Sequence, residues 1–201
     1  MSMEYVEIEG VAPKVSRIGL GTWAIGGGWM WGGTDEERSI QTICAALDRG
    51  ITLIDTAPVY GQGRSEEIVG KAVQRWGRRD RVVLATKVGL EWGRRGEPVR
   101  NASRRRIHKE IADSLHRLRT DYVDVYRVLD QPVVQVALWG ARSPEQLGAL
   151  EETMGWSLDD DAMQAIDAIV QEHVIDPVGP EFMAPPARTQ HRWLDALRRS
   201  A

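Results

Sequence analysis

Cysteine is nearly absent from this chain of 201 residues, in which Cys44 is the only one. A lone cysteine excludes an internal disulfide framework and any metal site built from several thiolates. The four histidines show no pairing with acidic residues at metal-ligand spacing, so the sequence predicts no metal site. We expect Cys44 to be a buried, inert thiol.

The sequence also lacks long apolar runs, internal repeats and any large excess of charge. No apolar stretch approaches the roughly eighteen residues that a membrane span needs, and the first residues lack the basic and apolar regions of a signal peptide. The net charge of -3 gives no general attraction to nucleic acid or to an anionic membrane. We therefore expect a cytoplasmic protein that binds neither of them.

What is present is a globular composition with an alternation of strand and helix patterns. With 42% hydrophobic residues, the chain can bury the core of one domain. The predicted elements are, in order, a hairpin in the alternating segment after Met3, a buried strand at residues 18–22, a helix capped by Thr34, a strand at 51–55, a helix opened by Ser65, a strand at 81–87 and a long helix capped by Ser103.

Four polar side chains fall at or just beyond the ends of these strands. This spacing of strands and helices is typical of a doubly wound sheet or a (β/α) barrel, and barrel enzymes carry their chemistry at the carboxyl ends of the strands. Thr22, Asp55 and Lys87 occupy such ends, and Tyr60 lies in the loop after Asp55. A lysine held by a carboxylate favours the ionised form of a nearby phenol, so these groups can form a proton donor.

Five motifs carry a family resemblance: GLGTW at residues 19–23, LIDTAPVYG at 53–61, SEEIVGKA at 65–72, LATKVG at 84–89 and SLHRLRTDYVDVY at 114–126. In this order the chain resembles the aldo-keto reductases, which are NADPH-dependent (β/α)8 barrels that reduce aldehydes and ketones. The resemblance covers residues 5–126 almost continuously. It resumes over about 128–188, where LWGARSPEQL resembles the family's cofactor clamp.

The resemblance implies a catalytic group, a cofactor site and a substrate pocket. Tyr60 would be the general acid that protonates the carbonyl oxygen, Lys87 would assist it, and Asp55 would pair with Lys87. The cofactor-binding residues would be Thr22, Trp23 and Asp55 near the nicotinamide ribose, Gly140, Ala141, Arg142 and Ser143 around the 2'-phosphate, and Gln146 near the adenine. The substrate pocket would be lined by Trp29, Trp31 and Trp92.

The chain departs from the family pattern after Tyr126. Leu129 stands where the resemblance places the family's catalytic histidine, and residues 133–140 look like the eighth barrel strand. Strands five to seven are absent, with the family's Ser-Asn pair, the aromatic that stacks on the nicotinamide and the loop that straps the pyrophosphate.

A full (β/α)8 barrel typically takes about 250 residues. We therefore expect an incomplete barrel, or an open and mostly parallel sheet of four to five strands, with flanking helices and an N-terminal hairpin. It would be one domain over residues 1–201, made of an N-terminal half-barrel at 1–127, a cofactor-clamp segment at 128–188 and a tail at 189–201.

The junction between the two halves leaves two arrangements open. If residues 122–128 and 133–139 are successive strands, only about four residues connect them, whereas parallel neighbours need a dozen or more. Either the second strand runs antiparallel, which moves Arg142 to the other end of the sheet, or residues 121–130 form a crossover helix. The alternation of VDVYRV favours a strand at 122–127.

Three functions remain open at this point. The chain could be a reductase of small carbonyl compounds with weak activity, or a catalytically dead relative or interaction module that still binds NADP(H). It could also be a remnant whose deletion is natural or artificial. Because an open sheet has edges that a closed barrel lacks, we also expect dimerisation, poor solubility or local disorder, and the dimer would be a homodimer formed through exposed strand edges.

Overall fold

The structure is a computed structural model that describes residues 3–28, 31–94, 98–128, 137–153, 159–162, 164–165 and 168. The predicted alternation of strands and helices is confirmed within this part of the chain. Its strands are β1 (Tyr5–Ile8), β2 (Val11–Ser16), β3 (Ile18–Gly21), β4 (Leu53–Asp55), β5 (Val83–Trp92), β6 (Pro98–Asn101), β7 (Val125–Val128) and β8 (Ala137–Gly140). Its helices are α1 (Glu36–Asp48), α2 (Arg64–Trp76) and α3 (Arg104–Leu118), with 3-10 helices η1 (Ala24–Gly26), η2 (Arg79–Arg81) and η3 (Pro144–Thr153).

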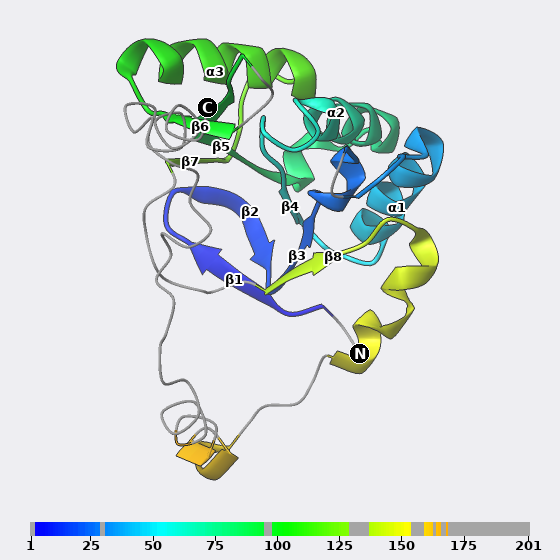
Figure 1. Cartoon of the computed structure of the whole chain (residues 1–201). Helices are drawn as coiled ribbons and strands as arrows, with labels where there is room; N and C mark the ends of the chain where they lie inside the picture. The colour runs from blue at the N-terminus through cyan, green and yellow to red at the C-terminus, as the bar shows by residue number, and fades with distance from the viewer. Residues whose placement is uncertain are drawn as a thin grey trace, which may run out of the picture.

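Five parallel strands form an open sheet in the order β7-β5-β4-β3-β8, and β6 adds an antiparallel pair to the far end of β5. The hairpin β1-β2 precedes this sheet and is antiparallel, as predicted. Figure 1 shows α1, α2 and α3 following one another in an arc around the strands. The expected architecture, a partial (β/α) barrel with an N-terminal hairpin, is confirmed.

The core lies between the strands and this arc of helices. Leu20, Ile54 and Leu84 come from three adjacent strands, and each is fully buried. Ile43 of α1 and Ile68 of α2 belong to the same buried cluster. The continuous apolar runs of the strands are explained by this position, because parallel strands in such folds are covered on both faces.

The junction between β7 and β8 differs from both arrangements that the sequence left open. β7 pairs in parallel with β5, with Ala85 opposite Val125, whereas β8 pairs in parallel with β3, with Gly21 opposite Gly140. The two strands lie at opposite edges of the sheet, so they are not neighbours. The antiparallel and helical interpretations are therefore wrong, and the preference for a strand at 122–127 is confirmed for Val125 onward.

This topology places β8 where the last strand of a closed barrel would lie, beside the first strand of the parallel sheet. The carboxyl ends of β3, β4, β5 and β8 consequently share one end of the sheet. The residues that follow β8 are thus at the same end as Asp55 and Lys87.

The start of α1 corrects one detail of the sequence analysis. The residue that caps α1 is Asp35, whose carboxylate accepts the backbone N–H of Arg38. Thr34 instead donates its hydroxyl to the carbonyl oxygen of Ile25. The predicted cap of α3 is confirmed, because the hydroxyl of Ser103 accepts the N–H of Arg106.

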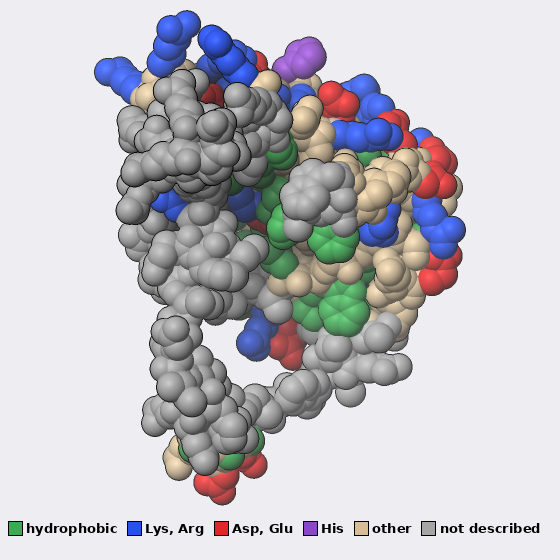
Figure 2. Space-filling model, in the orientation of Figure 1, with side chains coloured by type: hydrophobic (Ala, Val, Ile, Leu, Met, Phe, Trp, Pro, Cys, Tyr) green, Lys and Arg blue, Asp and Glu red, His purple; other side chains and the backbone are tan. Residues whose placement is uncertain are grey.

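Charged side chains gather on the outer surface of the helices (Figure 2), whereas the single cysteine is partly buried between two of them. Charged side chains of both signs cover the helical side of the molecule, and apolar side chains gather near the middle of the face in Figure 2. Burial raises the pKa of the Cys44 thiol, which lies on α1 and faces the carbonyl oxygen of Ala72 at 3.7 Å. None of the helices in the described ranges is long and apolar enough to cross a membrane.

Candidate active site

Lys87 is the centre of the candidate site. Its Nζ lies 2.7 Å from both carboxylate oxygens of Asp55 and 2.9 Å from the carbonyl oxygen of Thr56. It also lies 3.2 Å from the hydroxyl oxygen of Tyr60. An ammonium group has three protons, so two can serve these fixed acceptors while the third is directed at the phenol. The three side chains that the sequence placed at strand ends are therefore brought together.

The ion pair of Lys87 and Asp55 is shielded from water. The side chains are 13% and 10% exposed respectively. Register explains the contact, because β4 and β5 are adjacent and parallel with Asp55 opposite Ala85, two residues before Lys87. A carboxylate and an ammonium group at such burial attract each other more strongly than on a surface.

The ring of Tyr60 is fixed by the residues around its loop. It stacks on Trp23 with ring centroids 5.7 Å apart and an interplanar angle of 19°. Gly26 packs against the Tyr60 backbone so closely that an added Cβ would lie 2.8 Å from the Tyr60 carbonyl carbon. Gly61 has φ +61°, and a Cβ there would lie 2.1 Å from the oxygen of Gly26. The two glycines allow the loops after β3 and β4 to touch, which places the phenol.

A pocket of about 110 Å³ opens beside the phenol and the ammonium group. Its lining residues are Ala57, Pro58, Val59, Tyr60, Lys87, Val88 and Leu90. Apart from the Tyr60 hydroxyl and the Lys87 ammonium group, the lining side chains are apolar. Sequence reasoning did not name the apolar members, although Ala57, Pro58 and Val59 separate Asp55 from Tyr60 and could have been included for that reason.

Two of the three tryptophans predicted for the substrate pocket, Trp31 and Trp92, are not among these lining residues. Trp31 is 39% exposed and meets Trp23 edge-on at 5.9 Å. Trp92 is the last residue of β5, and its indole nitrogen is buried. Trp29 and Leu129 lie outside the described residues, so their predicted roles stay predictions.

Thr22, which the sequence predicts as a cofactor contact, is not exposed to a ligand. It is fully buried, and its hydroxyl donates to the carbonyl oxygen of Asp55 at 2.8 Å. Trp23, the next residue, is 39% exposed at the mouth of the site.

The predicted cofactor clamp lies at the start of η3, directly after Gly140 of β8 and the buried Ala141. The backbone N–H groups of Arg142 and Ser143 converge on the side-chain oxygen of Gln146, at 2.6 and 3.2 Å. The guanidinium of Arg142 donates to the carbonyl oxygen of Gly33 at 2.6 Å. Two N–H groups, a guanidinium and a hydroxyl at a helix start form a donor set that fits a phosphate.

Acidic and basic neighbours complete this segment. Glu145 accepts a hydrogen bond from Arg38 of α1 at 2.9 Å. The Ser143 hydroxyl, a backbone N–H and Arg38 together lower the pKa of the Glu145 carboxyl. The indole of Trp139 donates to the carbonyl oxygen of Gln146, which ties η3 back to β8.

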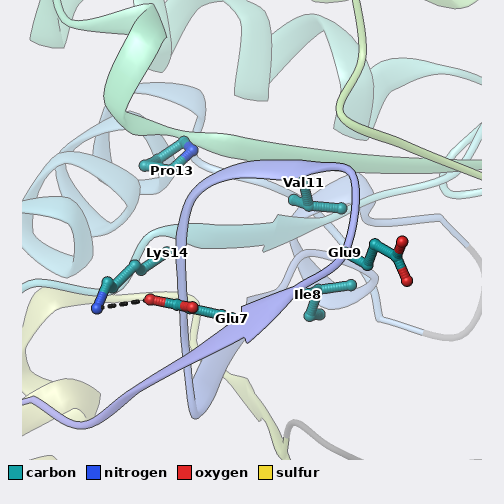
Figure 3. A pocket seen from close by; sticks show the side chains of 6 residues that line it. All are labelled: Glu7, Ile8, Glu9, Val11, Pro13 and Lys14. Carbon is teal, nitrogen blue, oxygen red and sulfur yellow. Dashed lines mark ion pairs between the residues drawn. The ribbon is translucent and has the colours of Figure 1, made fainter.

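A second hollow, of about 480 Å³, lies on the hairpin and shares no residue with the Tyr60 site. Figure 3 shows its lining, in which Glu7 and Lys14 form an ion pair of 2.9 Å. The hairpin leads into the amino end of β3, opposite the end that carries Asp55 and Lys87. Because Lys14, the one cation of this lining, pairs with Glu7 on the surface, the hollow offers no chemistry comparable to the Tyr60 site. Within the described part of the chain, no group of three or more His, Cys, Asp or Glu residues is placed to hold a metal.

Comparisons with known proteins agree with this geometry. The family model described as the aldo/keto reductase family matches residues 17–128. Aldo-keto reductase YhdN of Bacillus subtilis is 33% identical over 332 residues, which include 94% of this chain and 100% of that protein. Since the alignment is longer than the 201 residues of this chain, part of that relative has no counterpart here.

A second relative matches a shorter region at higher identity. The NADH-specific methylglyoxal reductase of Escherichia coli is 47% identical over 122 residues, which cover 56% of this chain and 37% of that protein. This chain thus matches little more than a third of that relative's length.

Solved structures give the same result for the fold. A glycerol dehydrogenase from Gluconobacter oxydans superposes with a TM-score of 0.73 at 26% identity, covering 92% of this chain and 100% of that chain. An aldo-keto reductase from Klebsiella pneumoniae in complex with NADPH has a TM-score of 0.50 at 32% identity, over 84% of this chain and 54% of that chain.

Proposed function

Because the chain belongs to the aldo/keto reductase family of oxidoreductases, we propose that it reduces small aldehydes and ketones with NADPH, using Tyr60 as the proton donor. The observation that carries this proposal is the contact of Lys87 with both Asp55 and Tyr60 beside an apolar pocket. A carbonyl compound in that pocket would have its oxygen near the phenol and its apolar part among the aliphatic side chains.

Tyr60, Lys87 and Asp55 would each have a separate role in the reduction. Tyr60 donates its hydroxyl proton to the carbonyl oxygen, and the Lys87 ammonium group stabilises the negative charge left on the phenol oxygen. Asp55 keeps the ammonium group in place and balances its charge. The hydride that adds to the carbonyl carbon comes from the bound cofactor.

Arg142, Ser143 and Gln146 would hold the adenosine end of that cofactor. The side-chain oxygen of Gln146 accepts the N–H groups of Arg142 and Ser143, so it marks the place where an oxygen of the bound cofactor would accept the same two groups. The guanidinium of Arg142 suits a 2'-phosphate dianion, which favours NADPH over NADH. One relative is an NADH-specific enzyme, so both cofactors have to be assayed.

We propose that the activity is weak. Leu129 replaces the histidine that the family resemblance places after the fourth strand, and the loss of one acid-base partner typically costs about 10² to 10⁴-fold in rate. The missing strands would also have carried groups that orient the nicotinamide, and hydride transfer depends on orientation.

The test is a titration with NADPH and with NADH that follows the fluorescence of the eight tryptophans, together with an assay of aldehyde-dependent NADPH oxidation. We expect saturable binding of NADPH and slow turnover that Tyr60→Phe abolishes. Tyr126→Phe is the matched control, because it removes a phenol on β7 whose hydroxyl donates to the carbonyl oxygen of Ile107 at 3.4 Å.

Other outcomes separate the alternatives. Binding without turnover would identify an inactive relative that retains nucleotide affinity. Turnover that is equal in wild type and Tyr60→Phe would exclude the proposed role of the phenol. Absence of both binding and turnover would indicate a remnant.

A further inference from the structure

Beneath the ion pair of Asp55 and Lys87 lies a cluster of three buried hydroxyl groups, of which only that of Thr22 belongs to a residue with a predicted role. Thr22, Thr56 and Ser65 are each fully buried. Thr22 directly follows β3, Thr56 directly follows β4, and Ser65 is the second residue of α2. The cluster therefore joins two strand ends to the start of the helix that comes after Tyr60.

The proton arrangement in this cluster follows from its distances. The Ser65 Oγ lies 2.8 Å from the Thr22 Oγ1 and 3.0 Å from the Thr56 Oγ1. The Thr22 hydroxyl donates to the carbonyl oxygen of Asp55, so it can accept the proton of Ser65. Since each hydroxyl has a single proton, Thr56 donates to Ser65, and Ser65 donates to Thr22, either to its Oγ1 or to its carbonyl oxygen at 2.9 Å. In both cases the Thr22 hydroxyl donates to the Asp55 carbonyl oxygen. Hydrogen bonds in such a chain strengthen one another.

This chain ends on the backbone that holds the ammonium group of Lys87. The Asp55 carbonyl oxygen accepts both the hydroxyl and the N–H of Thr22, at 2.8 and 3.0 Å. The carboxylate of Asp55 and the carbonyl oxygen of Thr56 are the two fixed acceptors of Lys87. A shift of the Asp55–Thr56 peptide would therefore move the ammonium group relative to the phenol.

Ser65 also reaches Tyr60 by its backbone. Its N–H donates to the Tyr60 carbonyl oxygen at 3.2 Å. One residue thus contacts the backbone of the proton donor through its amide and the supports of Lys87 through its hydroxyl. Ser65 itself contacts neither the Tyr60 hydroxyl nor the Lys87 ammonium group among the hydrogen bonds of the described residues.

We infer that Ser65 is a positioning residue, whose hydroxyl fixes the Lys87 ammonium group at the Tyr60 phenol by ordering Thr22 and Thr56. The effect on turnover rests on the proposed reductase function, whereas the effect on Lys87 itself does not. Two measurements keep these apart.

The first measurement is the rate at which acetic anhydride acetylates Lys87, located by mass spectrometry and divided by the rate at Lys14. Lys14 is an internal reference because its side chain is 67% exposed on the hairpin. In Ser65→Ala we expect the relative acetylation rate at Lys87 to rise about three- to tenfold. This fold-change corresponds to the net contribution of about one hydrogen bond. Ser39→Ala is the matched control, because Ser39 is also a buried serine with a hydroxyl bond, to the carbonyl oxygen of Asp35 on α1.

The second measurement is the steady-state kinetics with NADPH and an aldehyde. Ser65→Ala should lower kcat about 10- to 100-fold and change the KM for NADPH less than about twofold, because it misplaces the Lys87 ammonium group at the phenol without touching the clamp. Ser39→Ala should leave kcat unchanged even where it lowers the melting temperature by a similar amount.

Thr56 supplies a second pair of variants in case Ser65→Ala does not fold. Thr56→Val removes the first hydroxyl of the chain and should reproduce both effects, whereas Thr56→Ser keeps the hydroxyl and should restore them towards wild type. An unchanged Lys87 acetylation rate in the folded Ser65→Ala or Thr56→Val protein would overturn the inference. If Ser65→Ala raises the Lys87 acetylation rate while the wild-type protein shows no turnover, the positioning role is supported and the reductase function is rejected.

Discussion

Two glycines decide where the Tyr60 phenol lies. Gly26 and Gly61 let the loops after β3 and β4 come into backbone contact, and only the first of them has an ordinary backbone conformation. At Gly26 a new side chain would therefore meet a steric obstacle without added backbone strain.

We predict that Gly26→Ala displaces Tyr60. Its Cβ would lie 2.8 Å from the carbonyl carbon and oxygen of Tyr60, and these backbone atoms cannot rotate away as a side chain could. The free energy of unfolding should fall by about 1–3 kcal/mol, as in other overpacked sites, and NADPH oxidation should fall further than stability alone explains. Urea unfolding and the aldehyde assay measure the two effects. Gly33→Ala is the control, because nothing lies within 4 Å of a Cβ there, and an equal loss in both variants would contradict the prediction.

At the scale of elements, a buried charge network joins α2, α3 and β5. Glu66 is fully buried and accepts hydrogen bonds from Thr86 at 2.6 Å and from Arg117 at 2.6 Å. Arg117 also donates to Glu110 at 2.7 Å, and Glu110 pairs in turn with Arg106. Burial, with the charge of Glu66 nearby, raises the pKa of Tyr126 on β7 to about 12. Arg117 thus contacts both buried carboxylates, and Arg106 is a second cation at Glu110.

We predict that Arg117→Met is strongly destabilising. It leaves Glu66 and Glu110 without their shared partner, and breaking a buried ion pair in this way costs about 3–5 kcal/mol. Lys109→Met should cost no more than about 1 kcal/mol, because Lys109 pairs with Asp113 on the surface of the same helix. Urea unfolding of the two variants provides the comparison. Adding Glu66→Gln to Arg117→Met should recover part of the loss, and an additive result would exclude this explanation.

A second contact between elements predicts a pH dependence. The carboxylate of Glu37 on α1 accepts hydrogen bonds from both terminal nitrogens of Arg75 on α2, at 2.6 and 3.0 Å. Hydrogen bonds from Arg75 and then from Gln41 lower the pKa of the Glu37 carboxyl below its usual 4.5. A lowered pKa in the folded state means that the contribution of Glu37 to stability is present above pH 4.5 and is lost as the pH falls through the folded value.

We therefore predict that wild type is slightly more stable than Glu37→Gln at pH 7 and that this difference is lost progressively as the pH falls below 4.5 through the lowered pKa of the folded state. The pair is exposed, so the difference should also shrink in high salt. Urea midpoints measured for both proteins between pH 3 and 7 test this. A difference that grows towards low pH would show the opposite linkage.

The sequence predicted the strand ends well and the buried polar groups poorly. Asp55, Tyr60 and Lys87 were found because a strand end is visible as the stop of an apolar run. Glu110 and Arg117 share helix α3, and nothing local in the sequence shows that Glu66 of α2 will lie against Arg117. The hydroxyl cluster of Ser65 likewise depends on three segments meeting, which spacing along the chain does not reveal.

The positions of β7 and β8 also could not be predicted from local sequence, because they depend on contacts between distant segments. Both strands were recognised from their composition, but the assumption that consecutive strands are neighbours gave the wrong pairing. Their true partners, β5 and β3, are fixed by register with residues far away in the sequence. Asp35 and Thr34 are a smaller case, because two adjacent residues could both cap a helix and only the contact of Thr34 with Ile25 decides between them.

At the scale of the whole molecule, the described residues form five parallel strands of a fold that closes with eight. Since β8 lies beside β3, the cofactor clamp and the Tyr60 site stay at the same end of the sheet. We propose that residues 1–201 act as one domain, with the half-barrel of residues 1–127 followed by a clamp segment at 128–188 and a tail at 189–201. The arrangement explains how a shortened chain can retain both halves of the predicted site.

The parallel sheet has two edges, which are formed by β7 and β8. Among the described residues, β7 and β8 each have a strand partner on one side only, and Leu138 of β8 is 53% exposed. Unpaired N–H and C=O groups along an edge are a template for a second chain. Parallel strands at both edges would let β8 of one copy meet β7 of another about a shared axis, so that the two open sheets close each other. We therefore propose a homodimer that forms through these edges.

Light scattering at micromolar concentration should give twice the mass of the chain, which is 22.5 kDa. Leu138→Lys places a charge on the edge of β8 and should shift the mass towards that of the monomer, because edge charges are a common device against strand pairing. Gln41→Lys adds the same charge to the exposed face of α1 and should leave the dimer intact. If wild type is a monomer at these concentrations, or if both variants dissociate alike, pairing through the strand edges is excluded. A dimer that Leu138→Lys dissociates would show that the second copy takes the place of strands that the chain itself has lost.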